Sequence, residues 1–424
     1  MISRAVLSDW VVDARRRTFE LVSDLDDSQL LGPRLAIVNP LLWEIGHVAW
    51  FQEKWVLRHA LGEPPIRRDA DALWDSAAVA HDSRWDLPLP TRAGTLSYLT
   101  EVRDRVLDRL AHGGDDPRLL YFALHAAFHE DMHDEAFTYT RQTHGYPPPR
   151  LSGPRPVAAP GPLRGDAEVA GGTLLLGATA DEPFVFDNEK WAHPITVAPF
   201  AIARAPVTQE EFAAFADDGG YRRGDLWSEQ GWTWREGAGA GQPVYWRRDG
   251  GAWERRDFDR WVRLEPHRPV LHVNWHEAQA YCRWARRRLP TEAEWEAAAA
   301  LDPLAGRKRR FPWGDDTPPD GRPQLDAGVL GCADVSAHPE GDTPAGFRQM
   351  IGNVWEWTQD AFAPYPGFVP DAYKEYSEPW FFTHKVLRGG CWVTRGRLLR
   401  NTWRNFYPPD RRDVWAGFRT CALE

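Results

Sequence analysis

The chain has 424 residues, of which 43% are hydrophobic and 26% are charged, and its formal net charge is −10. This composition is typical of a globular protein, and the length allows two or three domains. The acidic balance gives no support for nucleic-acid binding or for a partner at an anionic membrane, and no apolar run is long enough to span a bilayer.

The N-terminal sequence, which holds Asp9 and Asp13, lacks the apolar core of a secretory signal. We therefore expect a cytoplasmic protein, in which cysteines stay reduced. The four cysteines lie far apart, form no Cys-x-x-Cys motif and are expected to be free thiols: Cys282, Cys332, Cys391 and Cys421.

The first 150 residues predict a four-helix bundle, because four helical patterns follow one another with a loop between each pair. Asn39-Pro40 begins the second helix, since proline suits the first helical turn. Asp116-Pro117 begins the fourth, and Gly145 with the prolines after it ends that helix. The predicted helices cover residues 4–31, 41–60, 95–111 and 117–144.

A proline-rich stretch predicts the domain boundary. Residues 147–168 carry no periodic apolar pattern, so we expect a linker over 151–168 between a domain at 1–150 and one at 169–424. The second domain is rich in Trp, Gly and Pro, which favours short elements and many loops. Its predicted strands lie at 171–177 and 195–197, and its predicted helices at 208–216, 275–285 and 291–300, the last with Thr291 and Glu294 as a capping box.

His129 and His133 lie four residues apart in the fourth predicted helix, so both imidazoles face the same side, one turn apart. Two such imidazoles can hold one metal ion and leave positions for a third ligand and for substrates. We choose His47 on the second helix as the third ligand, because facing helices of a bundle build metal sites, and the adjacent Gly46 is expected to permit close approach. His125, one turn before His129, remains open as a ligand or as a residue behind the ligands.

Three imidazoles suit iron, zinc, copper or nickel, so spacing alone does not choose the metal. The sequence His129-Glu130-x-x-His133 also matches the zinc-protease pattern, but nothing else in the chain predicts a peptide cleft. Glu130 and Glu135 are expected either to orient the imidazoles or to lie solvated on the helix.

Four long, Trp-rich segments resemble the formylglycine-generating-enzyme/sulfatase-modifying domain, which implies a C-type-lectin-like fold over about residues 169–424. The N-terminal half looks like a DinB-type helical bundle. A bundle followed by this domain is the architecture of the ergothioneine-pathway sulfoxide synthases, and residues 186–190 and 364–368 are also similar to that family. The four segments are 289–296, 352–358, 386–392 and 416–419.

The resemblance implies a mononuclear non-haem iron(II) held by His47, His129 and His133, with O2 as co-substrate. It also implies bonding of a chalcogen to the imidazole carbon of hercynine, a trimethylated histidine. Tyr373 falls near the family's catalytic tyrosine, which donates a proton or hydrogen atom. Tyr376 and Asn405 fall where the family contacts the hercynine betaine, and aromatic faces suit a trimethylammonium group; a packed surface aromatic is the other interpretation of each tyrosine.

Two departures from the ergothioneine pattern bear on the second substrate. Met132 stands where those enzymes carry a Gln that touches hercynine. Asn405-Phe406-Tyr407 differs from the Asn-Trp-Asp of the branch that uses glutamylcysteine, and residues 128–137 look more like the selenoneine synthase branch. Arg84 and Arg404 are expected either to hold a carboxylate of hercynine or of the donor, or to be ordinary surface charges.

The sequence therefore favours an O2-dependent iron synthase that joins hercynine to a selenosugar. One alternative is C–S bond formation from cysteine or gamma-glutamylcysteine, and another is a non-catalytic ligand-binding module, because fold alone does not fix function. A formylglycine-generating oxidase would need a closely placed reactive pair, such as Cys391 and Cys421.

Overall fold

The computed structural model describes residues 2–114, 116–151, 160–302, 307–315 and 322–423. The chain divides into two compact units, Met1–Ser152 and Gly153–Glu424. Within the described ranges, no helix has both the length and the apolar character needed to cross a membrane.

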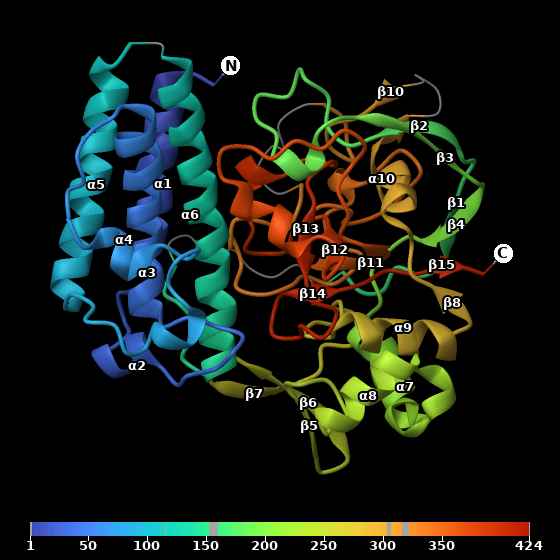
Figure 1. Cartoon of the computed structure of the whole chain (residues 1–424). Coiled ribbons are helices and arrows are strands. Elements are labelled where there is room, and N and C mark those ends of the chain that lie inside the picture. Colours follow the sequence, from blue (N-terminus) through green and yellow to red (C-terminus); the bar gives the residue numbers. More distant parts are fainter. Residues whose placement is uncertain (1, 115, 152–159, 303–306, 316–321, 424) are drawn as a thin grey trace. The chain divides into compact units, whose positions relative to one another are not determined.

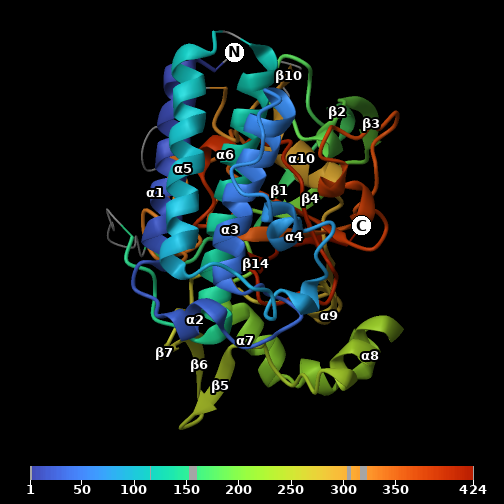
Figure 2. The same cartoon turned by 60° about the vertical axis from the view of Figure 1, so that its left-hand side comes forward.

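The first unit is helical, and its four long helical segments are α1, α3 with its continuation η1, α5 and α6 (Figures 1 and 2). Helix α1 contacts α5 and α6, and α3 contacts the same two helices. The elements are α1 (Arg4–Val22), α2 (Asp27–Leu31), α3 (Leu41–Gln52), the π-helix η1 (Glu53–Ala60), α4 (Ala70–Trp74), the 3-10 helix η2 (His81–Ser83), α5 (Arg92–His112) and α6 (Pro117–His144).

Local capping explains where these helices begin and end. Asp116 accepts a hydrogen bond from the Arg118 amide at 2.9 Å, and Gly145 ends α6 with a left-handed φ of 68°. The helix predicted over 4–31 is in fact two helices, α1 and α2. The Asp26 side chain accepts the Gln29 amide at 2.8 Å and so starts a new helix after a break.

The second unit consists of short strands and helices. Its strands are β1 (Asp166–Val169), β2 (Gly172–Leu176), β3 (His193–Val197), β4 (Phe200–Ala203), β5 (Trp246–Asp249), β6 (Ala252–Asp257), β7 (Arg260–Arg263), β8 (Arg287–Arg288), β9 (Leu301–Asp302), β10 (Arg307–Lys308), β11 (Trp355–Ala361), β12 (Lys385–Arg388), β13 (Asn405–Tyr407), β14 (Ala416–Gly417) and β15 (Cys421–Ala422). Its α-helices are α7 (Gln209–Asp217), α8 (Glu229–Gly237), α9 (Trp275–Trp284) and α10 (Glu292–Ala300). Single turns of 3-10 helix are η3 (Asp187–Glu189), η4 (Gly220–Arg222), η5 (Gly224–Leu226), η6 (Pro339–Gly341), η7 (Lys374–Tyr376), η8 (Glu378–Trp380) and η9 (Gly396–Leu398).

Among the described residues there are two four-stranded sheets, in the orders β1-β4-β15-β8 and β13-β12-β11-β14, and separate smaller sheets β2-β3, β5-β6-β7 and β9-β10. β1 begins at Asp166, inside the stretch predicted as linker, and pairs with β4 in antiparallel register. The predicted domain limits at residues 150 and 169 stay predictions. Helix α10 has the expected capping box, in which the Thr291 hydroxyl accepts the Glu294 amide at 3.1 Å.

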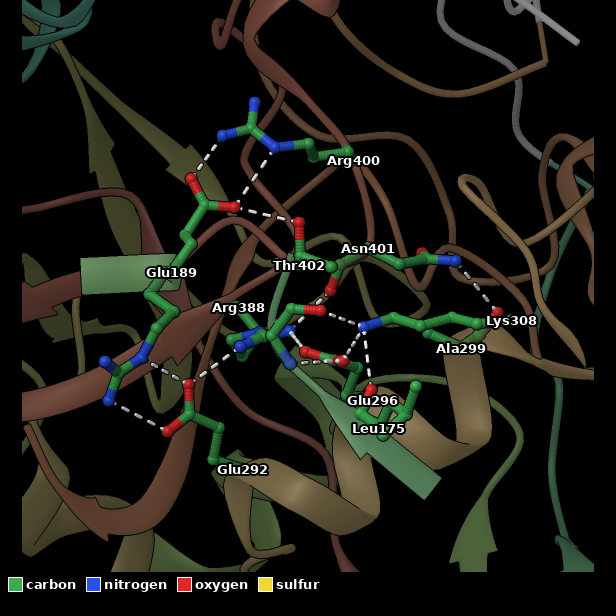
Figure 3. Close-up of polar contacts among 12 residues, drawn as sticks. Leu175, Glu189, Glu292, Glu296, Ala299, Lys308, Arg388, Arg400, Asn401 and Thr402 are labelled. Atoms are coloured by element: carbon green, nitrogen blue, oxygen red, sulfur yellow. Dashed lines mark hydrogen bonds and ion pairs between the residues drawn. The ribbon is translucent and has the colours of Figure 1, made fainter. Parts of the chain in front are cut away.

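A buried ionic network holds α10 against the sheet (Figure 3). Arg388 of β12 donates to Glu292 at 2.7 Å and to Glu296 at 2.5 Å, and Lys308 also pairs with Glu296. Since an unpaired charge inside a protein is costly, these carboxylates fix α10 relative to β12. The next strand along the sheet is β13, where Leu387 of β12 is paired with Asn405.

Candidate metal centre and substrate segments

His47 from α3 and His129 and His133 from α6 meet inside the first unit. One nitrogen from each ring lies within 4.8 Å of the others. The ring centroids are 5.1 Å apart for His47 and His129, 5.0 Å for His47 and His133, and 4.5 Å for the helical pair. The residues that the structure describes thus bring together the same three side chains that the sequence singles out, and this arrangement suits a metal ion with open positions.

Hydrogen bonds fix which ring nitrogen is available in two of the three histidines. The His47 Nδ1–H donates to the Trp74 carbonyl at 2.8 Å, and the His133 Nδ1–H donates to the Glu44 carboxylate at 2.6 Å. In both rings Nε2 then keeps the lone pair that a metal needs. Glu44, which is 2% exposed, is the charged partner of this set.

Burial favours the neutral form of two of the imidazoles, those of His47 and His129. The pKa values of His47 and His129 lie well below the ordinary value, chiefly because burial disfavours the imidazolium and secondly because His133 is close. Phe51 stacks on His129 with ring centroids 3.6 Å apart, and Trp43 stacks on His47 at 4.9 Å. Neutral, packed imidazoles are the form that binds metals, so the donor set fits the iron that the sequence resemblance implies.

His125 lies one turn before His129, and its ring meets the edge of Phe51 at 5.4 Å. It does not belong to the histidine set whose nitrogens approach one another within 4.8 Å. The described residues therefore do not place His125 among the candidate ligands.

Both carboxylates that the sequence suggested, Glu130 and Glu135, are buried, and the first of them bonds elsewhere. Glu130 is 1% exposed, so it is not solvated. Its carboxylate pairs with Arg15 at 2.7 Å and not with a candidate ligand. The carboxylate that orients His133 is that of Glu44. Its only sequence signal was its place three residues before His47, on the same face of one helix.

Gly46 permits a close approach by Trp74 of α4. A Cβ at residue 46 would lie 2.1 Å from the Trp74 indole nitrogen. Because the Trp74 carbonyl also accepts the His47 hydrogen bond, Gly46 indirectly sets the orientation of that imidazole.

The two other predicted site residues of the first unit lie near the histidines. Arg84 is 9% exposed, its guanidinium lies 3.9 Å from the centroid of the Trp43 ring, and it donates to Asn39 at 2.6 Å. Met132 is half-buried on α6, directly before His133. The proposed contacts of Arg84 and Met132 with substrate stay predictions.

In the second unit, Tyr376 and Phe406 belong to one aromatic cluster. Their ring centroids lie 5.8 Å apart, Tyr376 stacks on Phe186 at 4.7 Å, and Phe406 stacks on Phe362 at 4.0 Å. Burial raises the pKa of Tyr376 above its ordinary value, so its phenol stays protonated. Tyr373 is half-buried just before η7, and its carbonyl accepts the Tyr376 amide at 3.2 Å.

Asn405 and Tyr407 flank Phe406 on β13, and both are half-buried. The Asn405 side-chain oxygen accepts the Phe406 amide at 2.8 Å. Arg404, which is 1% exposed, donates to Glu292 at 2.7 Å and belongs to the buried ionic network rather than to the surface. The catalytic and substrate-binding roles assigned to residues of this unit stay predictions.

All four cysteines are buried and free, as expected. Burial raises the pKa of the Cys332 and Cys421 thiols to about 12, so both remain protonated at neutral pH. A thiolate nucleophile of the kind that a cysteine-based oxidase needs is therefore not prepared at either position.

Comparison with known proteins agrees with the division of the chain into two compact units. The family model of the sulfatase-modifying factor enzyme 1-like domain matches residues 155–423, and that of the DinB superfamily matches residues 11–137. The chain is 40% identical to a hercynine oxygenase of Mycobacterium tuberculosis over 99% of both chains, and 39% identical to one of Mycolicibacterium thermoresistibile over 98% of this chain and 94% of that one.

A formylglycine-generating enzyme of Streptomyces coelicolor is 33% identical, with 65% of this chain and 94% of that one covered. That match leaves about a third of the chain without a counterpart, whereas the hercynine oxygenases match nearly the whole chain. On this full-length similarity, the chain belongs to the family of the hercynine oxygenases, with a DinB-type first unit and a second unit of the sulfatase-modifying-factor type.

Proposed function

We propose that this protein is a non-haem iron(II) oxygenase that uses O2 to bond a chalcogen atom to the imidazole ring of hercynine. The observation that carries the proposal is the cluster of His47, His129 and His133 in a chain that matches hercynine oxygenases over its full length. His47 and His133 would hold the iron through Nε2, since their Nδ1 atoms are already hydrogen-bonded.

Bound iron(II) supplies O2 activation and open coordination positions on which two reactants can be brought together. The contribution of the chain is to pack His129 against Phe51 and His47 against Trp43, and to orient His47 and His133 by hydrogen bonds. In the second unit, Tyr373 would donate the proton or hydrogen atom, and the Tyr376 and Phe406 rings, with Asn405, would hold the trimethylammonium end of hercynine.

For the second substrate we propose a selenosugar, which makes the reaction a carbon–selenium bond formation as in selenoneine biosynthesis. Two substitutions relative to the ergothioneine pattern support this choice: Met132 where a Gln is expected, and Tyr407 where an Asp serves the glutamylcysteine donor. The main alternative is an ergothioneine-type sulfoxide synthase that takes cysteine or gamma-glutamylcysteine.

The test begins with protein loaded anaerobically with iron(II). Hercynine and O2 are then supplied with a selenosugar, cysteine or gamma-glutamylcysteine in parallel, and products are followed by mass spectrometry. A hercynine–selenium adduct formed only with the selenosugar is the expected result, and His133→Ala should abolish it. His112→Ala is the matched control, because the His112 side chain on α5 is 77% exposed.

A sulfoxide formed with a thiol donor would assign the protein to the ergothioneine branch instead. Hercynine binding without bound iron and without product would favour a non-catalytic binding module. If selenium transfer is found, Tyr407→Asp should raise the use of gamma-glutamylcysteine relative to the selenosugar, measured as the ratio of the two kcat/KM values.

A further inference from the structure

Residues 186–190 include three successive polar residues whose side chains are buried inside the second unit. Asp187 is 2% exposed, and Asn188 and Glu189 are fully buried. Phe186 precedes them, and Lys190 follows. Because burying charged and amide groups is costly unless they are bonded, such a run requires partners on the elements around it.

One set of partners lies in the segment that carries Tyr373 and Tyr376. The Ser377 hydroxyl donates to Asp187 at 2.5 Å, and the Asn188 side-chain amide donates to the Ser377 oxygen at 3.1 Å. Lys190 pairs with Asp371 at 2.6 Å. Together with the Phe186–Tyr376 stack, these contacts attach both ends of segment 371–377 to residues 186–190.

The other set of partners lies in the segment that leads into β13. Glu189 accepts hydrogen bonds from the Thr402 hydroxyl at 2.8 Å and from the Arg400 Nε at 3.1 Å (Figure 3). The Asn188 carbonyl accepts from the Arg404 guanidinium at 2.7 Å, and Asn405 follows directly. Residues 186–190 therefore bond to both segments, which also meet each other where the Tyr376 and Phe406 rings lie 5.8 Å apart.

We propose that residues 186–190 set the position of segment 371–377 relative to β13, and that Asp187 and Glu189 are positioning residues for the hercynine reaction. This inference rests on the proposed function, because Tyr373, Tyr376 and Asn405 are the residues whose placement it explains. A displacement of about 1 Å between reacting groups can lower a rate about 100-fold, so bonds that hold two such segments have a direct effect on turnover.

The charge of Asp187 gives the proposal a second readout. Burial raises the pKa of Asp187 to about 6, with the nearby Asp371 adding to the effect and the Ser377 hydrogen bond opposing it. The other charged groups of this region are Lys190, which pairs with Asp371, and Glu189 with its partner Arg400. Below about pH 6 the carboxyl is protonated, and its charge-assisted bond from Ser377 weakens.

Stability changes with pH in the opposite direction to turnover. The pKa of Asp187 in the folded protein lies above its ordinary value of 3.8, so ionisation of this group opposes folding, and the cost is fully present above about pH 6. A neutral residue at this position removes that cost. Asp187→Asn is thus expected to keep or raise the unfolding temperature at pH 7.5 while it lowers turnover.

The experiment compares wild type with Asp187→Asn, Ser377→Ala, Glu189→Gln and the control Tyr221→Phe in the full-length, iron-loaded protein. The readouts are kcat/KM for hercynine from pH 5 to 8, unfolding temperature, and amide hydrogen exchange. Tyr221 donates a buried hydrogen bond to Glu277 at 2.6 Å. Both residues lie far from residues 186–190 in the sequence, and this bond involves none of those residues. Tyr221→Phe should therefore lower the unfolding temperature without changing kcat/KM or exchange in 371–377.

We expect Asp187→Asn and Ser377→Ala to lower kcat/KM by about 10- to 100-fold and to speed exchange in 371–377, and Asp187→Asn to remove the inflection near pH 6. Glu189→Gln should speed exchange in 400–407. Unchanged exchange in both segments, or a pH profile that keeps its inflection in Asp187→Asn, would overturn the proposal. If the wild-type protein makes no product from hercynine, the proposed function fails, while the exchange data still decide whether residues 186–190 hold the two segments.

Discussion

At the residue scale, the orientation of His133 depends on one buried carboxylate. Glu44 accepts the imidazole Nδ1–H at 2.6 Å and is 2% exposed. Partners of this kind typically change metal affinity by 10- to 100-fold when they are removed, because they fix the tautomer and the ring orientation. We predict that Glu44→Ala raises the iron(II) dissociation constant by about that factor, measured by anaerobic titration calorimetry.

Glu101→Ala is the control for this prediction. Glu101 on α5 is 47% exposed and forms an ion pair with Arg105, one turn along the same helix. Its iron affinity should equal that of the wild type. Equal affinities for Glu44→Ala and the wild type would show that Glu44 does not orient a ligand.

Gly46 is a second residue whose expected effect on the candidate metal site is indirect. An added Cβ would lie 2.1 Å from the Trp74 indole, so Gly46→Ala must displace the residue whose carbonyl holds His47. Overpacking of this kind typically costs about 1–3 kcal/mol of unfolding free energy, and we expect weaker iron binding as well. Gly237→Ala is the control, because a Cβ there meets nothing within 4 Å; urea denaturation of both variants provides the measurement.

The sequence predicted the three histidines but not the residues that orient them. His129 and His133 are separated by one helical turn, and this local relation can be seen without a structure. The partner of His133 is 89 positions away along the chain, and the partner of His47 is a backbone carbonyl 27 positions away. Contacts of that range follow from tertiary packing, which no spacing rule describes.

At the element scale, one buried ion pair joins α1 to α6, the helix that carries two of the histidines. Arg15 is fully buried, bonds to Glu130 at 2.7 Å and also donates to Gln52 at 3.1 Å. Removal of one partner leaves an uncompensated buried charge. We predict that Arg15→Ala lowers the free energy of unfolding by about 3–5 kcal/mol.

The adjacent Arg16→Ala provides the comparison. Arg16 pairs with Asp13 at 2.5 Å, but its side chain is 58% exposed, and exposed pairs contribute little. Chemical denaturation should therefore separate two arginines that are neighbours in the sequence. Similar losses for both variants would contradict the assignment of the buried pair.

The boundaries of a helix could be predicted where residues close in the sequence cap its ends. Boundaries that depend on distant contacts could not. The limits of α6 and the capping box of α10 follow from Asp116-Pro117, Gly145 and Thr291. The change from α-helix to π-helix at Glu53 was missed. Glu53 is fully buried and bonds to Tyr98 of α5 at 2.6 Å, a partner that the sequence of α3 does not reveal.

At the scale of the whole molecule, the three candidate metal ligands all belong to the first unit. Iron(II) that binds the folded histidine set should stabilise that unit by mass action, by about 2.7 kcal/mol at 100 times the dissociation constant. In anaerobic calorimetry we expect iron(II) to raise the unfolding temperature of the first unit, and His133→Ala to remove the increase. A rise confined to the second unit would place the metal elsewhere.

The architecture of the second unit could be predicted from family resemblance but not from periodicity. Several of its strands are only two residues long, such as β8, β14 and β15. Such strands carry too few residues for an alternating pattern to be recognised. The Trp- and Gly-rich segments identify the domain, while the bonds that residues 186–190 make to positions near 377 and 402 appear only in the folded chain.

The division of labour between the units has a consequence for divergence within the family. All three imidazoles and the Glu44 carboxylate come from the first unit, whereas β13 and segment 371–377 come from the second. Under the proposed function, substitutions in the second unit can therefore alter which molecule is accepted without changing a group that orients an imidazole. Under that function, a lineage can change its donor in small steps, each of which starts from a protein whose histidine set is intact.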